Sequence, residues 1–230
     1  MESDDIIPVS LRGSSLERSL HEVESIYAAI DKAEAGFRES AAAAGKPLSC
    51  PAGCGSCCEG FVPDVLPLEA AYLAAYILGS RPELAHRPLS GVPPCPFYDA
   101  DRPEAHCSVY RARPLICRLF AFSAVSGKAE EPSFALCRRM PALPGTETRS
   151  WSGEALREAF GAAPPLMSAF AAELLGLDPD STGERRLLAE ALPRALAKVG
   201  LALSLAGMAR GDDEPEPNEP EPDAPSPLAA

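Results

Sequence analysis

Thiol groups dominate the reactive chemistry of this sequence. Eight cysteines occur in 230 residues, and they form two groups along the chain. The first group is a dense box of four within nine residues, and the second is spread over a longer stretch. Such a density of soft sulfur donors excludes calcium and magnesium but does not separate zinc from iron. We predict that all eight cysteines are metal ligands: Cys50, Cys54, Cys57, Cys58, Cys95, Cys107, Cys117 and Cys137.

Two kinds of metal group suit these thiols. Zinc accepts four thiolates in a tetrahedral shell, and iron–sulfur clusters are also held by four closely spaced cysteines. Cys57 and Cys58 are adjacent, so their side chains diverge and would serve different metal ions or bridge them. That geometry suits a cluster somewhat better than a lone zinc. The predicted cofactor is therefore an iron–sulfur cluster or zinc.

Other roles for the thiols remain open. Disulfides need an oxidising compartment, which nothing in the composition indicates. Buried cysteines also pack as small hydrophobic residues, and this alternative applies most to Cys137, which stands alone. It does not explain four thiols in nine residues. His106 precedes Cys107 and could ligate a metal, support a ligand or face solvent.

Positive charge gathers around the second group of cysteines, at Arg111, Arg113, Arg118, Arg138 and Arg139. Four thiolates on one divalent ion leave a net negative charge, which nearby guanidinium groups would stabilise. We predict that Arg113 and Arg118, on either side of Cys117, bind the cofactor. Ordinary salt bridges with acidic helices and the docking of an anionic substrate are the alternatives.

Composition narrows the class of protein. The net charge is −12, but seven acidic residues lie between 212 and 223, leaving about −5 for the rest. A general basic surface for nucleic acid is therefore not expected. The acidic start lacks the apolar run of a secretory signal, and no apolar run of membrane-spanning length is recognised. We predict a cytoplasmic protein that binds neither nucleic acid nor membrane.

Apolar periodicity predicts a mainly α fold. Residues Leu16, Leu20, Val23, Tyr27 and Ile30 recur at helical spacing, which predicts a helix from Ser14 or Ser15 to about residue 44. Ser15 and Arg18 do not form a capping box. Further helices are expected over 68–78, 151–160, 165–177 and 184–208, with Ser181 and Glu184 as a capping pair for the last. In a short helix opened by Pro51, residues 54, 57 and 58 would share one face.

These elements predict a single irregular helical domain built around a cysteine-ligated metal site. Residues 1–13 are expected to be a flexible lead-in, and 14–210 to form the domain. Within it, the cysteine motifs span 50–140 and a helical scaffold spans 150–210. The acidic, proline-rich residues 211–230 are expected to be disordered and are a candidate arm for a protein partner.

The order of the motifs resembles the YkgJ-like cysteine-cluster family, which is described as zinc- or iron-chelating. The matching residues are the box Cys50–Cys58, then Cys95-Pro96-Phe97, Cys107-Ser108-Val109-Tyr110, Arg113-Pro114 and Cys117-Arg118, with a later cysteine at Cys137. The resemblance covers about residues 48–140. This chain departs from the family pattern in its C-x3-C first gap and in Ala121, where proline is frequent.

Three functional hypotheses follow. The first is a metal-binding protein with an iron–sulfur cluster or zinc at its centre. The second is an enzyme that uses the cluster for redox or methyl-transfer chemistry, since the cysteine pattern is similar to that of bacterial flagellin lysine-N-methylases. The third is a structural zinc module that presents its helices to a protein partner.

Overall fold

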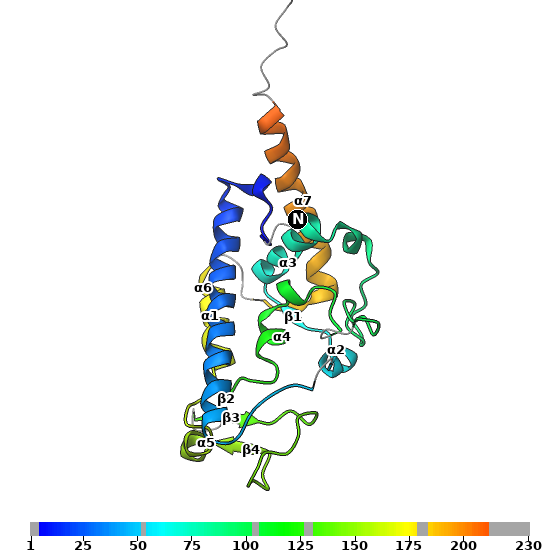
Figure 1. The fold of residues 1–230 in the computed structure, drawn as a ribbon. Helices are drawn as coiled ribbons and strands as arrows, with labels where there is room; N and C mark the ends of the chain where they lie inside the picture. Colours follow the sequence, from blue (N-terminus) through cyan, green and yellow to red (C-terminus); the bar gives the residue numbers. More distant parts are fainter. Residues whose placement is uncertain (1–4, 52–53, 103–105, 127–130, 179–183, 212–230) are drawn as a thin grey trace, which may run out of the picture.

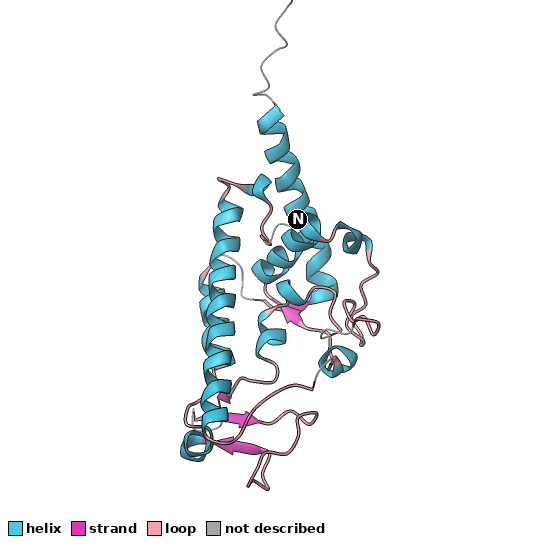
Figure 2. Ribbon diagram, in the orientation of Figure 1, coloured by secondary structure: helices cyan, strands magenta, loops and turns pink. Residues whose placement is uncertain are grey.

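A computed structural model of the chain describes residues 5–51, 54–102, 106–126, 131–178 and 184–211 (Figure 1). Helices make up most of the regular structure, and short strands form two small sheets (Figure 2). The predicted mainly α class is therefore confirmed. The predicted C-terminal tail lies outside the described residues from residue 212 onward.

The longest helix, α1 (Ser15–Ala43), begins after Ser14, which caps it. The Ser14 hydroxyl accepts a hydrogen bond from the backbone N–H of Glu17 (3.0 Å), a donor that a helix start leaves unpaired. The Glu17 carboxylate accepts a hydrogen bond from the backbone N–H of Gly13 (2.6 Å), just before the cap. The expected helix is confirmed, and its buried face is Leu20, Val23, Tyr27, Ile30, Glu34, Phe37 and Ala41.

The larger hydrophobic core lies where α3 (Pro67–Ser80) packs between α1 and α7 (Leu188–Gly211). Residues 68–77 of α3 are all buried, as expected for a helix that is apolar on every side. A two-stranded antiparallel sheet, β1 (Asp64–Val65) with β5 (Arg186–Leu187), joins the starts of α3 and α7. The helix predicted over 184–208 begins later, at Leu188, and Ser181 of its predicted cap lies outside the described residues.

The predicted flexible lead-in contributes to this core. Residues Val9–Leu11 form a 3-10 helix (η1), and Ile6, Ile7 and Leu11 are buried. The composition of residues 1–13 is polar overall, but these three side chains are large enough to anchor the segment against the helices. The described part of residues 1–13 is therefore a packed element, which differs from the prediction.

A smaller core, rich in aromatic side chains, includes Phe37 and Ala41 near the C-terminal end of α1. It lies beside a three-stranded antiparallel sheet formed by β2 (Val125–Ser126), β3 (Pro132–Ala135) and β4 (Ser150–Ser152). Helix α5 (Gly153–Phe160) follows β4 directly. The strands β2–β4 and helix α5 lie at this C-terminal end of α1 (Figure 1). Trp151 lies in β4 and not in the predicted helix 151–160, and its ring centroid is 4.9 Å from that of Phe160.

The remaining helical elements are short. They are α2 (Ser56–Gly60), η2 (Pro82–His86), η3 (Tyr110–Ala112), α4 (Leu115–Leu119) and α6 (Met167–Gly176). Helix α6 confirms the prediction over 165–177 with shorter bounds. Most of the cysteines belong to α2, α4 and the loops between them, so the helices of the two cores act as a frame for these loops.

Helix α7 extends beyond the body of the molecule (Figure 1). Its stretch Leu188–Met208 is long and apolar enough to cross a membrane by length and composition, whereas the sequence reading recognised no such run. The N-terminal half of α7 packs on α3, and Leu201, Leu205 and Met208 are exposed. Core helices of soluble proteins satisfy the same criterion.

Candidate metal centre

A cavity of about 690 Å³ lies between α1, α2 and α4, and all eight cysteines line it. No disulfide joins them, and each is a free thiol. The first box and the second group are separated by 36 residues between Cys58 and Cys95, yet the fold brings them to one wall. The predicted ligand residues therefore meet in a single place.

The first box is a short stretch of chain with few anchors. The backbone N–H of Cys54 donates to the Pro51 carbonyl (3.1 Å), and that of Cys58 donates to the Gly55 carbonyl (2.8 Å) at the start of α2. These turns direct Cys54, Cys57 and Cys58 toward the cavity. Cys50, in the extended segment before them, is exposed at the same wall.

The second group begins with Cys95, which is buried and links the two cysteine groups directly. Its backbone N–H donates to the carbonyl of Cys58 (2.7 Å). Cys107 pairs with Tyr98 in an isolated antiparallel bridge, and the Tyr98 hydroxyl donates to Glu59 of the first box (2.9 Å). The two cysteine groups are thus joined by hydrogen bonds as well as by the cavity.

Gly55 lies where the first cysteine box packs closely against the second cysteine group. A Cβ atom built on Gly55 would lie 2.7 Å from Cβ of His106 and 2.8 Å from Cε2 of Tyr98. Such contacts are closer than van der Waals packing allows. Glycine is therefore required here for α2 to lie against the 98–107 loop.

Cys117 is placed by a buried carboxylate in the larger core. Glu69 of α3 accepts hydrogen bonds from the backbone N–H of Leu115 (2.7 Å), from the Tyr27 hydroxyl (3.1 Å) and from the backbone N–H of Leu66 (2.9 Å). Arg185 lies 3.6 Å from it. Glu69 therefore fixes α4, and with it Cys117, against α1 and α3. Sequence reasoning treated helix 68–78 simply as core; the one acidic residue in this apolar helix was the available signal.

The structure gives the two predicted cofactor-binding arginines different surroundings. Arg118 is buried and donates to the carbonyls of Arg113 (3.0 Å) and Arg111 (2.6 Å), and it pairs with Asp31 of α1 (2.7 Å). Its guanidinium also lies over the Tyr27 ring, 4.3 Å from the centroid. Arg118 therefore holds the 111–118 segment on α1. Both arginines line the cavity, and their contact with a cofactor stays a prediction.

Arg113 has far fewer partners. Its guanidinium lies 4.0 Å from the centroid of the Tyr110 ring. Its Nε atom is buried and has no hydrogen-bond partner among the described residues. The positive charge of Arg113 lowers the pKa of Cys57, Cys107 and Cys117, although it is never the largest influence on them.

The inner thiols shift one another's pKa in opposite directions. The neighbouring Cys58 thiol lowers the pKa of Cys57 to about 6 and also lowers that of Cys107. Cys107 and Cys57 in turn raise the pKa of Cys58. Cys57 and Cys107 are thus the thiols most readily deprotonated, which is the form that binds metal.

Loss of hydration has the opposite effect on three other thiols, even on Cys50, which is only partly covered. Desolvation raises the pKa of Cys50 to about 11, and it also raises the pKa of Cys95 and of Cys117. Neighbouring thiols add to the effect: Cys137, Cys54 and Cys57 act on Cys50. A bound cation would relieve this penalty, because it compensates the thiolate charge.

The cavity also contains residues that sequence reasoning did not select. Glu34 and Arg38 of α1 line it, with 3.6 Å between Oε1 of Glu34 and NH1 of Arg38. Burial raises the pKa of Glu34. Phe61 and Phe120 form an aromatic pair at the wall, with ring centroids 5.8 Å apart. Glu34 occupies a core position in the α1 stripe, which marks it in the sequence as unusual.

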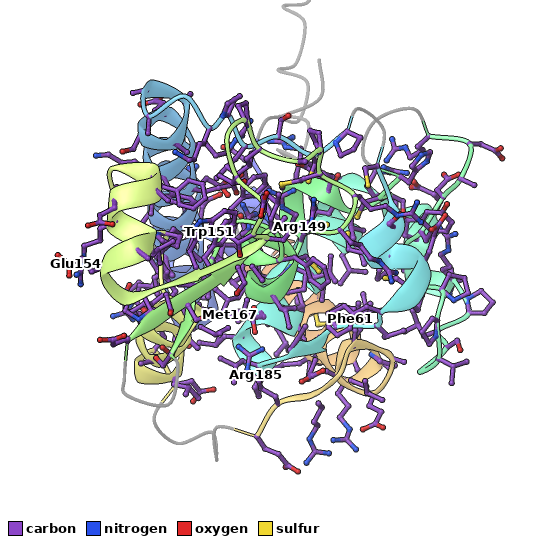
Figure 3. All side chains as sticks on the ribbon, turned by 90° about the horizontal axis from the view of Figure 1, so that it is seen from below. Phe61, Arg149, Trp151, Glu154, Met167 and Arg185 are labelled. Carbon is purple, nitrogen blue, oxygen red and sulfur yellow. The ribbon has the colours of Figure 1, made fainter. Side chains whose placement is uncertain are left out.

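Cys137 and His106 have different positions relative to the cavity. Cys137 lines it, next to the smaller core, and its carbonyl accepts a hydrogen bond from Arg149 (2.6 Å). Figure 3 shows Arg149 between the Phe61 side of the molecule and the side of Trp151 and Glu154. His106 is not among the lining residues; its ring Nδ1 lies 3.1 Å from the Asp99 carbonyl oxygen.

The donor set suits a thiolate-bound metal group, but the thiols are not gathered at one point. Among the described residues, which include all eight cysteines, no three cysteine, histidine or carboxylate side chains are arranged to hold a single ion. The cysteines therefore suit a metal group because of the chemistry of their sulfur donors and because they share one cavity.

Residues 49–139 match a family model named CxxCxxCC and described as a "Putative zinc- or iron-chelating domain". These residues, about two-fifths of the chain, are similar to that family of domains. This confirms the resemblance seen in the motifs and extends over all eight cysteines. The match ends before α5, so α5, α6 and α7 lie outside the CxxCxxCC domain. No curated protein and no solved structure shows significant similarity to the chain.

Proposed function

We propose that the CxxCxxCC domain holds an iron–sulfur cluster through thiolates from both cysteine groups. The observation that carries this proposal is the convergence of eight free thiols on one cavity without a ready-made site for a single ion. A cluster contains several irons and sulfides, so its cysteine ligands lie further apart than the ligands of one ion.

Zinc fits the arrangement less well. In a tetrahedral zinc site with Zn–S bonds of about 2.3 Å, sulfur atoms lie about 3.8 Å apart, and structural sites of this kind are closed. Here the thiols are spread around a cavity of about 690 Å³, and its lining includes the exposed Phe120, Arg138 and Arg139. A compact structural zinc site would not need such an opening.

The chain supplies three things to the cluster. Cys57 and Cys107 provide thiolates at neutral pH more readily than the other thiols. The guanidinium of Arg113 compensates negative charge, and Phe61 and Phe97 supply apolar cover. An iron–sulfur cluster, when bound, supplies one-electron redox chemistry, and burial and nearby hydrogen-bond donors adjust its potential. We also propose that the protein works in the cytoplasm, where thiols stay reduced.

Anaerobic purification of the full chain tests the proposal. The expected product is brown, with a broad visible absorption band, and contains iron together with acid-labile sulfide. Iron, sulfide and zinc are measured on the same sample. A colourless protein with stoichiometric zinc and no sulfide would contradict the cluster and favour a zinc-chelating role.

A further inference from the structure

The cavity is larger than a metal centre alone requires. A volume of about 690 Å³ lies within the range of small-molecule binding sites. Part of its wall carries no sulfur and is formed by Phe61, Phe120, Phe122, Arg38 and Arg113. An aromatic surface with a few polar groups is the usual lining of a site for an organic ligand.

Arg113 presents a hydrogen-bond donor that the described protein does not use. Its Nε atom is buried and unpaired, and a buried donor without a partner costs free energy. The side chain is held in place on the Tyr110 ring at 4.0 Å, and Arg118 donates to its carbonyl oxygen at 3.0 Å. No hydrogen bond from its terminal guanidinium nitrogens is found within the described residues either, and Arg113 lines the cavity. A guanidinium fixed in this way is suited to binding a carboxylate through those terminal nitrogens.

The charge of the lining favours an anion. Five arginines and one carboxylate, Glu34, are among the described lining residues. Glu34 lies 3.6 Å from Arg38 and also interacts with the charge of Arg113, and Arg118 is paired with Asp31. Beside a four-thiolate centre of charge about −2, the wall with Asp31 included would keep an excess of about one positive charge. Arg138 and Arg139 are exposed and form no ion pair within the described part of the chain.

The apolar part of the wall lies at the surface. Phe120 is 46% exposed, an unusual position for a phenylalanine, and its ring packs against Phe61 with 5.8 Å between centroids. Arg38 lies over the nearby Phe122 ring, 5.2 Å from its centroid. An aromatic ligand would cover exposed apolar area and pack on these rings in the geometries that aromatic pairs prefer.

We propose that this cavity binds a small aromatic carboxylate beside the metal centre, with the carboxylate on Arg113 and the ring against Phe61 and Phe120. The site uses side chains other than the thiols, so it goes beyond the proposed metal function. It shares the cavity with the metal but does not depend on whether the metal group is a cluster or zinc.

Titration calorimetry on the full, metal-loaded chain tests this site with phenylacetate as the probe. Phenylacetamide, which has the same shape but no charge, is the matched ligand. We expect saturable binding of one phenylacetate per chain and at least about tenfold weaker binding of phenylacetamide, because a charge-assisted hydrogen bond is lost. Absence of phenylacetate binding, or equal affinity for the two, would overturn the proposal.

Two variants assign the binding to this part of the cavity. Arg113→Gln should weaken phenylacetate binding about tenfold or more, and Phe120→Ala should weaken it by a smaller factor. Arg157→Gln, an exposed arginine on α5, is the control and should bind normally. Metal content is measured on every sample, so that a failed metal centre is distinguished from a failed anion site.

The variant results decide between two roles for Arg113. Weakened binding with unchanged metal content supports the anion site. If Arg113→Gln loses metal, Phe120→Ala becomes the deciding variant: reduced phenylacetate affinity with full metal content supports the site. Unchanged affinity in Phe120→Ala would then overturn it, because Arg113 would belong to the metal centre alone.

Discussion

The two cysteine groups reach the same cavity by different means. The first, on α2 and the segment before it, is held by turns within itself and by its contacts with the second. The second is fixed to the framework by buried polar side chains, chiefly Glu69 and Arg118. Arg81, Arg87 and Arg102 add hydrogen bonds to the carbonyls of Ser108, Tyr98 and Cys107.

The two cysteine groups therefore have different structural roles. The second group is a rigid half-site whose position is set by the larger core. The first group completes the site by docking against it, through the Cys95–Cys58 and Tyr98–Glu59 hydrogen bonds and the close approach at Gly55. Changes in the framework should therefore affect folding and metal together, whereas changes at the docking contacts should affect metal retention alone.

Removal of the Glu69 carboxylate should have the largest effect. Glu69→Ala leaves the N–H groups of Leu66 and Leu115 and the hydroxyl of Tyr27 without their buried acceptor. We expect a loss of about 3–5 kcal/mol in the free energy of unfolding, measured by urea denaturation. Glu158→Ala, an exposed carboxylate on α5, is the control. A loss below about 1 kcal/mol would show that Glu69 does not anchor the second group.

Arg118→Lys should have the next largest effect. Lysine keeps the charge, but its ammonium group cannot bind the carbonyls of Arg111 and Arg113 and the Asp31 carboxylate at the same time. We expect a loss of about 2 kcal/mol in stability and less metal per chain after purification. Arg138→Lys, on an exposed arginine of the same cavity, should change neither. Unchanged stability and metal stoichiometry in Arg118→Lys would remove its framework role.

Gly55→Ala separates docking from folding. The added methyl group would collide with His106 and Tyr98, so α2 must move away from the second group. Overpacking of about 1–3 kcal/mol predicts roughly tenfold faster loss of metal to a chelator, with little change in urea denaturation. Gly60→Ala, in the same helix but with nothing within 4 Å of the added atom, is the matched control. Equal rates in the two variants would contradict the docking model.

Tyr98→Phe should have the smallest effect of the series. It removes the exposed hydrogen bond to Glu59 but keeps the ring that contacts His106. We expect metal loss to a chelator to accelerate by no more than about threefold, since exposed hydrogen bonds contribute little. An effect larger than that of Gly55→Ala would show that the Tyr98 hydroxyl, and not the close packing at Gly55, joins the two cysteine groups.

Much of the helical framework could be predicted from the sequence. The stripe along α1 and the apolar run of α3 repeat over enough residues to reveal their period. The strands are only two to four residues long, too short for an alternating pattern, so both sheets were missed. Trp151 was assigned to a helix for the same reason, since the helix begins only two residues later.

The candidate site was predictable in its donors but not in its supports. The number and spacing of the cysteines indicate metal binding, so these eight residues could be selected without a structure. Arg113 and Arg118 share one motif, and only the fold shows that Arg118 is fully engaged while a donor of Arg113 is unpaired. Glu34 and Glu69 gain their roles from helix faces that meet in three dimensions.

A single centre shared by both cysteine groups is tested most simply through the iron and acid-labile sulfide content of anaerobically prepared Cys57→Ser and Cys107→Ser, one variant from each group. If the centre is shared, each variant loses most of its iron and sulfide, to a similar extent. Retention of about half the metal in both variants, or full retention in either, would contradict a shared centre.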